Sequence, residues 1–127
     1  MKLLYLQLVF TLFSVASIAQ NINLQEDTTV NNLHDSRQGS CAMGDIDNDG
    51  DLDLIITGPD AVLANRKTTL YSNDGLGNFT EITDTGLSND TEFGDISFAD
   101  VDGDGDLDLM LTGRVGSPVH YANFYLN

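Results

Sequence analysis

The sequence predicts an all-β protein made of two repeated units of antiparallel strands. The chain repeats itself at an offset of 55 residues, because the acidic, glycine and aliphatic positions of residues 44–58 recur in residues 99–113. Such self-similarity at a fixed spacing is the sequence signature of modular folds. In each copy an aspartate-rich loop runs into a short aliphatic stretch that ends in Thr-Gly, which is typical of a strand rather than a helix.

A signal peptide is expected before the repeated units. Lys2 precedes an apolar run over residues 3–18, and Ser17-Ile18-Ala19 has small residues where signal peptidase reads them. The run is too short to span a membrane comfortably, so we predict cleavage after Ala19 and export to the extracellular space or cell surface. No transmembrane segment is expected after cleavage, and the alternative is a retained amphipathic anchor. Residues 20–38 are polar and predict a mostly irregular lead-in with at most one edge strand.

The first unit is expected over residues 39–92. Strands are predicted at 40–44, 52–57, 68–73 and 79–82, and the turn Asn73-Asp74-Gly75-Leu76-Gly77 supplies residues that tolerate positive φ. In the second predicted strand Leu52, Leu54 and Ile56 share one face, and Ile55 lies with Asp53 on the other. Both faces carry bulk, which favours a central strand.

The second unit is expected over residues 93–127 and is incomplete. Its strands are predicted at 93–99, 107–112 and 122–126, and no fourth strand follows in the sequence. Outer faces with Leu52, Leu54, Leu107 and Leu109 are expected to lack partners, because repeat units of this kind stabilise one another by stacking. The sequence therefore predicts an N-terminal piece of a larger exported protein, or a chain that assembles with further units in trans.

The repeated loops carry the pattern DxDxDGxxD, which predicts two metal sites. Alternate residues of a tight loop turn their oxygens to the same side, and calcium accepts six to eight oxygens at about 2.3–2.6 Å in irregular geometry. The position-7 residues would contribute backbone carbonyls, and Gly50 and Gly105 stand where the chain reverses. The predicted calcium ligands are Asp45, Asp47, Asp49, Asp51 and Asp53 in the first loop and Asp100, Asp102, Asp104, Asp106 and Asp108 in the second.

Two alternatives compete with a calcium loop between strands. A solvated Asp/Gly turn is the simpler one, but it gives no reason for the whole constellation to repeat, and clustered carboxylates repel one another without a cation. An EF-hand needs a bidentate Glu at position 12 and flanking helices. Position 12 holds Ile56 in the first loop and Leu111 in the second, so the helical alternative is disfavoured.

These residues resemble the FG-GAP/VCBS repeats of integrin-α-type β-propellers. The resemblance rests on Phe93-Gly94 followed by residues 100–109, on the matching residues 45–54 and on the hairpin over 70–79, and it covers about residues 39–127. It implies four-stranded propeller blades, each with a calcium ion in the loop between its first two strands, so the expected fold is a partial β-propeller of about two blades. The first unit departs from the family pattern with Gln38-Gly39 in place of Phe-Gly.

The amino-acid composition argues against some classes of binding partner. The formal net charge is −15, and ten of the twenty acidic residues lie in the two loops. This acidity argues against nucleic acid and anionic membranes as partners. The lone Cys41 has no internal disulfide partner, and because it aligns with Ile96 it is expected to be a small core residue rather than a reactive thiol.

The predicted function is that of a secreted calcium-binding module for adhesion or for recognition of a protein or carbohydrate, a role that the resemblance implies. The alternative is the N-terminal part of an exported propeller enzyme that acts on polysaccharide. The chain has two isolated histidines, His34 and His120, and no Trp, and its acids are mostly committed to metal. A fold that also occurs in enzymes does not by itself indicate catalysis. Because no set of residues suited to catalysis is visible, we predict a non-catalytic chain.

Overall fold

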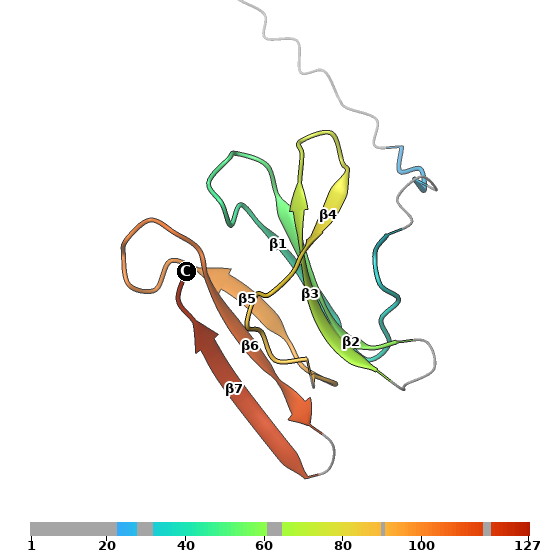
Figure 1. Cartoon of the computed structure of the whole chain (residues 1–127), viewed down its shortest axis with the longest axis vertical. Coiled ribbons are helices and arrows are strands. Elements are labelled where there is room, and N and C mark those ends of the chain that lie inside the picture. The colour runs from blue at the N-terminus through green and yellow to red at the C-terminus, as the bar shows by residue number, and fades with distance from the viewer. Residues whose placement is uncertain (1–22, 28–31, 61–64, 90, 116–117) are drawn as a thin grey trace, which may run out of the picture.

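In a computed structural model of the chain, the described residues form two antiparallel β-sheets (Figure 1). The structure describes residues 23–27, 32–60, 65–89, 91–115 and 118–127, so the predicted signal peptide lies outside it. The first sheet has the order β1-β2-β3-β4 and the second the order β5-β6-β7, and no helix of membrane-spanning length and hydropathy occurs in the described part of the chain. The strands are β1 (Ser40–Gly44), β2 (Asp53–Pro59), β3 (Arg66–Asn73), β4 (Phe79–Ile82), β5 (Ile96–Ala99), β6 (Asp108–Val115) and β7 (Val119–Tyr125).

The strand predictions are confirmed in number and order, with shifted ends. β1 and β4 have the predicted bounds, whereas β2 and β6 begin one residue later than expected and extend past the Thr-Gly pair. Shifts of three residues occur at the start of β5, which begins at Ile96 instead of Phe93, at the end of β6, and at the start of β7, which begins at Val119 instead of Ala122. Phe93 has a φ of +52°, and a residue in the left-handed region cannot continue an extended strand.

Phe93 and Gln38 both have left-handed backbone conformations, and the glycine that follows each of them is required by a close approach of two backbones. Gln38 has the same φ of +52° as Phe93, so both units turn alike before the glycine. A Cβ on Gly39 would stand 1.7 Å from the carbonyl oxygen of Thr57, and one on Gly94 would stand 1.9 Å from that of Thr112. The backbone of the first strand therefore touches that of the second where only glycine fits.

The two sheets are built in the same register. Gly44 pairs with Asp53 as Ala99 pairs with Asp108, and Leu54 pairs with Tyr71 as Leu109 pairs with Tyr125. Because paired residues share a face and neighbours along a strand alternate, each sheet has two equivalent faces. The face carrying Leu54 in the first sheet corresponds to the face carrying Leu109 in the second.

The sheets pack through unlike faces, and this interface is the core. Ile55 from the first sheet and Leu109, Leu111 and Ile96 from the second are 0–7% exposed and form one cluster. The prediction that Leu109 lacks a partner is therefore wrong, because the first sheet covers its face. Leu54 is also buried, at 9% exposure, whereas Leu52 precedes β2 and is 52% exposed.

Cys41 lies on the outer face of the first sheet and is exposed. The prediction that it is a core residue is wrong for this structure, although its equivalent Ile96 is 7% exposed. The difference follows from stacking: the first sheet covers the position of Ile96, and no sheet of the described chain covers that of Cys41.

The described residues of the lead-in form no strand, as predicted, but the contacts of the residues before each sheet also repeat. His34 N–H donates to the Tyr71 hydroxyl at 2.9 Å, and Ser88 N–H donates to the Tyr125 hydroxyl at 3.2 Å. Arg37 N–H reaches the Pro59 carbonyl at 2.9 Å, as Glu92 N–H reaches the Arg114 carbonyl at 3.1 Å. Residues 32–38 are thus a structural counterpart of the connection that leads into the second sheet.

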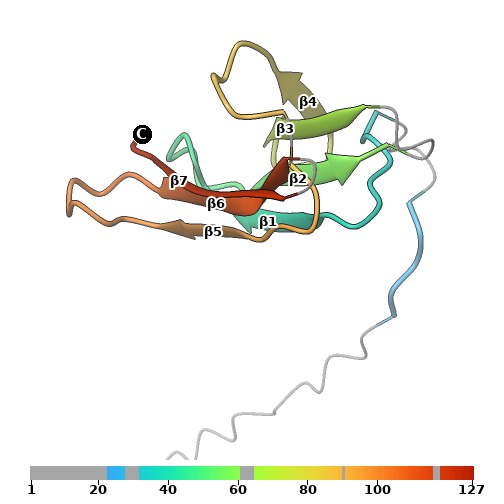
Figure 2. The ribbon, with the colours of Figure 1, turned by 90° about the horizontal axis from the view of Figure 1, so that it is seen from below.

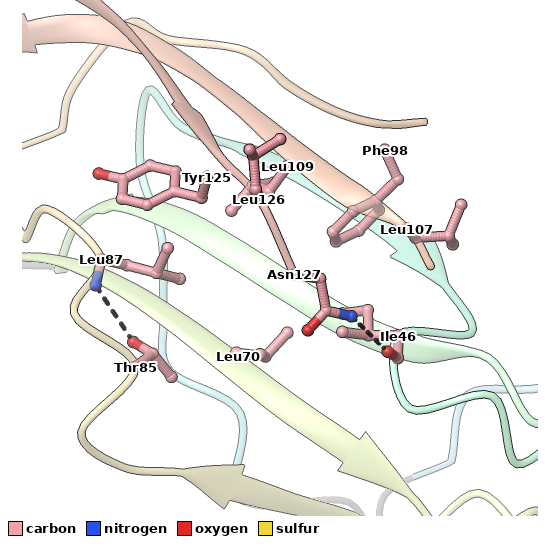
Figure 3. A pocket seen from close by; sticks show the side chains of 10 residues that line it. All are labelled: Ile46, Leu70, Thr85, Leu87, Phe98, Leu107, Leu109, Tyr125, Leu126 and Asn127. Carbon is pink, nitrogen blue, oxygen red and sulfur yellow. Dashed lines mark hydrogen bonds between the residues drawn. The ribbon is translucent and has the colours of Figure 1, made fainter. Parts of the chain in front are cut away.

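The inter-sheet core opens into a mostly apolar pocket of about 340 Å³ (Figure 3). Side chains of Leu70 and Leu87 lie on one side, and those of Phe98, Leu109 and Tyr125 lie on the other. Asn127 closes one end, where its amide Nδ2 donates to the Ile46 carbonyl at 2.9 Å. The pocket marks where the two sheets diverge, and β1 and β5 remain side by side (Figure 2).

Candidate metal centres

Each aspartate loop joins the first two strands of its sheet and is folded by its own carboxylates. Asp47 Oδ1 accepts from Asp49 N–H at 3.3 Å, and Asp49 Oδ1 accepts from Asp51 N–H at 2.9 Å. The second loop repeats both contacts, from Asp104 N–H to Asp102 at 3.2 Å and from Asp106 N–H to Asp104 at 3.0 Å. Side-chain bonds to the backbone two residues on are the usual reason that Asp favours turns.

The glycine at position 6 completes the reversal. Gly50 and Gly105 have φ of +95° and +100°, and each donates its N–H to the position-1 carboxylate, Asp45 at 3.0 Å and Asp100 at 3.1 Å. A side chain at these φ values would strain the loop. The predicted role of the two glycines is therefore confirmed.

Three carboxylates converge in each loop. One ligand oxygen from each of Asp45, Asp47 and Asp49 lies within 4.8 Å of the others, and the same holds for Asp100, Asp102 and Asp108. Asp45 Oδ1 is shielded from solvent and has no hydrogen-bond partner among the described residues. A buried carboxylate oxygen without a donor is costly, so this atom fits a site that receives a cation.

Asp53 and Asp108 have a second role as anchors of the sheet. Both are 1% exposed. Asp53 accepts from Ile46 N–H at 3.0 Å and from Asn73 N–H at 2.9 Å, and Asp108 accepts from Val101 N–H at 2.9 Å and from Asn127 N–H at 3.0 Å. Each carboxylate thus joins the start of its loop to the last residue of the third strand, or in the second sheet to a residue just after it, which the spacing of the pattern did not reveal.

The remaining predicted ligands stand at the edge of these clusters. Asp104 is not within the second cluster and Asp53 is not within the first, although each belongs to the loop as predicted. The side chain of Asp51 lies beside Gly75, where an added Cβ would stand 2.3 Å from Asp51 Oδ2. Coordination by the backbone carbonyls of Asp51 and Asp106 stays a prediction.

Electrostatics disfavour bare, ionised loops. Desolvation, together with the charges of Asp49 and Asp53, raises the pKa of Asp47. At Asp102 the hydrogen bond from Asp104 N–H lowers the pKa, but desolvation and the neighbouring carboxylates outweigh it, so the pKa is raised overall. A divalent ion would remove this repulsion, and both loops therefore fit the binding of a metal ion.

The two loops contact each other through Asn48, a residue to which the sequence pattern gave no role. Asn48 Nδ2 donates to Asp106 Oδ1 at 2.7 Å. Asn48 has a φ of +60°, and the equivalent position of the second loop is Gly103 with +84°. The shared left-handed position was a detectable signal, because Asn and Gly are the residues that adopt it most readily.

Comparison with known proteins gives one family. The family model described as FG-GAP-like repeat matches residues 45–111, from the first aspartate loop to the second strand of the second sheet. The chain belongs to the FG-GAP-like repeat family. The match spans both loops and the complete first FG-GAP-like unit after its first strand, which confirms the resemblance and the all-β fold. No curated protein and no solved structure matched the chain.

The histidines lie apart from the FG-GAP-like loops. His34 belongs to the segment before β1, and its pKa is lowered by burial and by the charge of Lys67, against opposing effects of the Gly58 backbone, Glu81 and Asp35. Its ring nitrogens are shielded and make no hydrogen bond of standard geometry within the described chain, although the Gly58 backbone is near. His120 is exposed in β7. That the chain is not an enzyme stays a prediction.

Proposed function

We propose that this FG-GAP-like chain is a calcium-binding propeller module of an exported protein, and that calcium rigidifies the loops through which it meets a protein or carbohydrate. The observation that carries the proposal is the pair of in-register carboxylate clusters, one of which holds the unpartnered oxygen Asp45 Oδ1. The proposed export rests on the signal-like residues 1–19, and it agrees with the metal because extracellular calcium fills sites of modest affinity.

Calcium is favoured over other divalent ions by the donor set. Every candidate ligand is an oxygen, and no Cys or His lies in either loop. Carboxylate and carbonyl oxygens are the ligands that suit calcium, magnesium and manganese. Magnesium demands near-ideal octahedral geometry and keeps several waters, whereas calcium accepts an irregular loop of carboxylates and carbonyls.

Calorimetric titration of the folded mature chain tests the metal assignment. Calcium should bind with a stoichiometry of two per chain, and magnesium at the same concentration should compete weakly. Asp104→Ala should weaken the second site and leave the first nearly intact. Asp35→Ala, which removes an exposed carboxylate outside both loops, is the matched control and should change neither site.

Two results would contradict the assignment. Absence of binding heat and of any calcium-induced shift in thermal unfolding would remove the metal sites. An equal loss of calcium affinity at both sites in Asp104→Ala would mean that each ion is not bound by the carboxylates of a single loop. Recognition is tested separately, by binding to immobilised polysaccharides and extracellular proteins in calcium and in chelator, where the proposal expects retention only with calcium.

A further inference from the structure

Each sheet has one apolar face that nothing in the described chain covers with another sheet. On the first sheet this outer face carries Cys41, Met43 and Ile56, and Met43 is 53% exposed. Leu54 and Tyr71 on the same face are already buried, at 9% and 0% exposure, and His34 of the segment before β1 contacts Tyr71. On the second sheet it carries Met110 and Phe124, and Phe124 is 56% exposed. These are the end faces of the stacked pair, and they point in opposite directions along the stack.

The interface between the two sheets of one molecule shows which kind of surface each end face can pack against. Ala42 pairs with Ile55 and Ile55 with Leu70, which together form the face of the first sheet that packs on the second. In the same register, Ser97 pairs with Met110 and Met110 with Phe124. The end face of the second sheet is therefore the counterpart of the face that the first sheet already uses for packing.

The same holds for the other end. The face of the second sheet inside the core carries Ile96, Phe98, Leu109 and Leu111, whose counterparts at the 55-residue offset are Cys41, Met43, Leu54 and Ile56. Each end face is thus equivalent to one side of an existing interface. Since the two end faces of the described sheets point apart, they can contact each other only between two copies.

A segment before the first sheet supports this geometry independently. Asn23-Leu24-Gln25-Glu26 aligns at the same offset with Asn78-Phe79-Thr80-Glu81, which contains most of β4. Residues 23–27 belong to no strand of the structure, and Leu24 is 91% exposed. In Figures 1 and 2 the segment lies on the side of the molecule away from β7.

β7 offers the place that this segment would occupy. In the first sheet β4 pairs with β3, with Tyr71 opposite Glu81. In the described second sheet β7 pairs only with β6 and has a free edge. An exposed strand edge binds an extended segment through backbone hydrogen bonds.

We propose that copies of this chain associate head to tail. The end face of the second sheet of one copy packs on the end face of the first sheet of the next, and residues 23–27 of that next copy pair with β7. A single rotation and translation of one copy onto the next produces both contacts. The same arrangement exists within the chain, where β4 pairs with β3 and then leads through residues 84–92 into the second sheet, which stacks on the first. Such a heterologous interface forms a ring if its rotation closes and an open filament if it does not.

Sedimentation velocity of the mature chain over a range of concentrations tests the association. Calcium and about 0.15 M salt are needed to weaken repulsion between copies, because the predicted removal of Lys2 with the signal peptide changes the net charge of −15 to −16. The mass should rise with concentration above that of one chain. Phe124→Glu and Leu24→Asp should each weaken association at least tenfold, because a charge would enter an apolar contact.

Matched variants separate the interface from general effects on folding. Leu76→Glu adds the same charge at a residue of the β3–β4 turn that is 86% exposed, and it should associate like the parent. Circular dichroism and calcium titration should show that Phe124→Glu remains folded and metal-bound. Loss of association with intact calcium binding supports this interface without depending on the proposed function.

Cross-linking tests the register. Ile55 and Ile96 belong to one cluster inside the molecule, so their counterparts Met110 and Cys41 should meet between copies. Met110→Cys should give chains linked through Cys41 under mild oxidation or with a short bismaleimide, and Met110→Cys with Cys41→Ser should not. A concentration-independent single-chain mass, association unaffected by Phe124→Glu, or cross-linking that persists without Cys41 would each overturn the proposal.

Discussion

At the scale of single residues, the aspartates of one loop are expected to have opposite effects on the stability of the metal-free protein. Asp108 is 1% exposed and accepts two backbone N–H groups, so its carboxylate is part of the framework. Asp102 is exposed and crowded by other carboxylates. The repeated spacing alone assigned both residues to the metal and could not separate these roles, because it carries no information about which backbone groups face each side chain.

Asp108→Asn is expected to destabilise the second sheet even in the absence of calcium. The change replaces a charged acceptor of two backbone donors by an amide that satisfies one of them well, at a cost of about 2–3 kcal/mol. Chemical unfolding in chelator measures the loss. Unchanged stability in chelator would mean that the carboxylate serves the metal alone.

Asp102→Asn is expected to do the reverse. The raised pKa of Asp102 means that its ionised form is disfavoured in the folded state, so the metal-free fold loses stability as the pH rises through and above the ordinary Asp pKa of about 3.9. Removing the charge should stabilise the metal-free protein at pH 7 and weaken calcium binding at the second site. The parent and variant unfolding curves in chelator should converge near pH 3, and a variant less stable than the parent at pH 7 would contradict the assignment.

At the scale of elements, the glycine before each first strand fixes how closely two strands approach. A Cβ at Gly94 would stand 1.9 Å from the Thr112 carbonyl oxygen. Gly94→Ala should therefore separate β5 from β6 at a cost of about 3 kcal/mol. Gly77→Ala is the control, since its Cβ would meet nothing within 4 Å. This substitution should cost only the strain of a side chain at positive φ, about 1–2 kcal/mol. Thermal unfolding distinguishes the two, and equal losses would remove the steric argument.

The connection between the sheets is fixed by an ionic cluster around Glu92. Arg114 donates to Glu92 Oε1 through Nη2 at 2.9 Å and Nε at 3.2 Å, and Arg66 Nε lies 3.3 Å from Oε2. Arg114 also stacks on Phe93, 4.7 Å from the ring centroid. Because Arg66 belongs to the first sheet and Arg114 to the second, Glu92 holds the two sheets together.

Glu92→Gln should lower stability at neutral pH and lose its effect in acid. The hydrogen bond from Arg114 lowers the pKa of Glu92 despite the opposing desolvation, so its contribution is complete above the ordinary Glu pKa of about 4.3 and disappears as the pH falls through the lower folded value. The parent should therefore approach the variant below that value in pH-dependent unfolding. Glu81→Gln, which breaks the exposed ion pair with Lys67, is the control and should change little at any pH.

The elements themselves were largely predictable from the sequence, for physical reasons that also explain the errors. Aliphatic stretches bounded by Asp, Asn and Gly located all the strands, because period and turn chemistry are local. The left-handed Phe93 and the hydrogen-bonded segment 32–38 depend on contacts with Gln38, Pro59 and Tyr71. Such contacts are distant in sequence, and no local pattern encodes them.

At the scale of the whole molecule, the errors concerned stacking. Leu109 was expected to be uncovered and Cys41 to be buried, and the structure gives the opposite for both. The two positions lie on equivalent faces, so their burial depends on whether another sheet lies in front. A repeat predicts the face that each residue occupies, and only the arrangement of the sheets decides what covers it.

Calcium removal should loosen the loop ends of both sheets before the core. Hydrogen exchange in chelator should rise first in residues 45–52 and 100–107, whose backbone N–H groups depend on the carboxylates. Ile55 and Leu111, both 0% exposed, should exchange last because they lie in the inter-sheet core. Uniform acceleration along the chain would show that the metal stabilises the fold as a single unit.

The exposed hydrogen bond of 2.7 Å from Asn48 to Asp106 is expected to couple the two loops modestly. When an ion orders one loop, it also positions a neighbour of the other, so the second ion spends less of its binding free energy on ordering. Linkage requires this help to be reciprocal, whichever loop fills first. The binding isotherm should accordingly be steeper than that of two independent sites, and Asn48→Gly, which retains the left-handed turn but lacks the amide, should return it to independence.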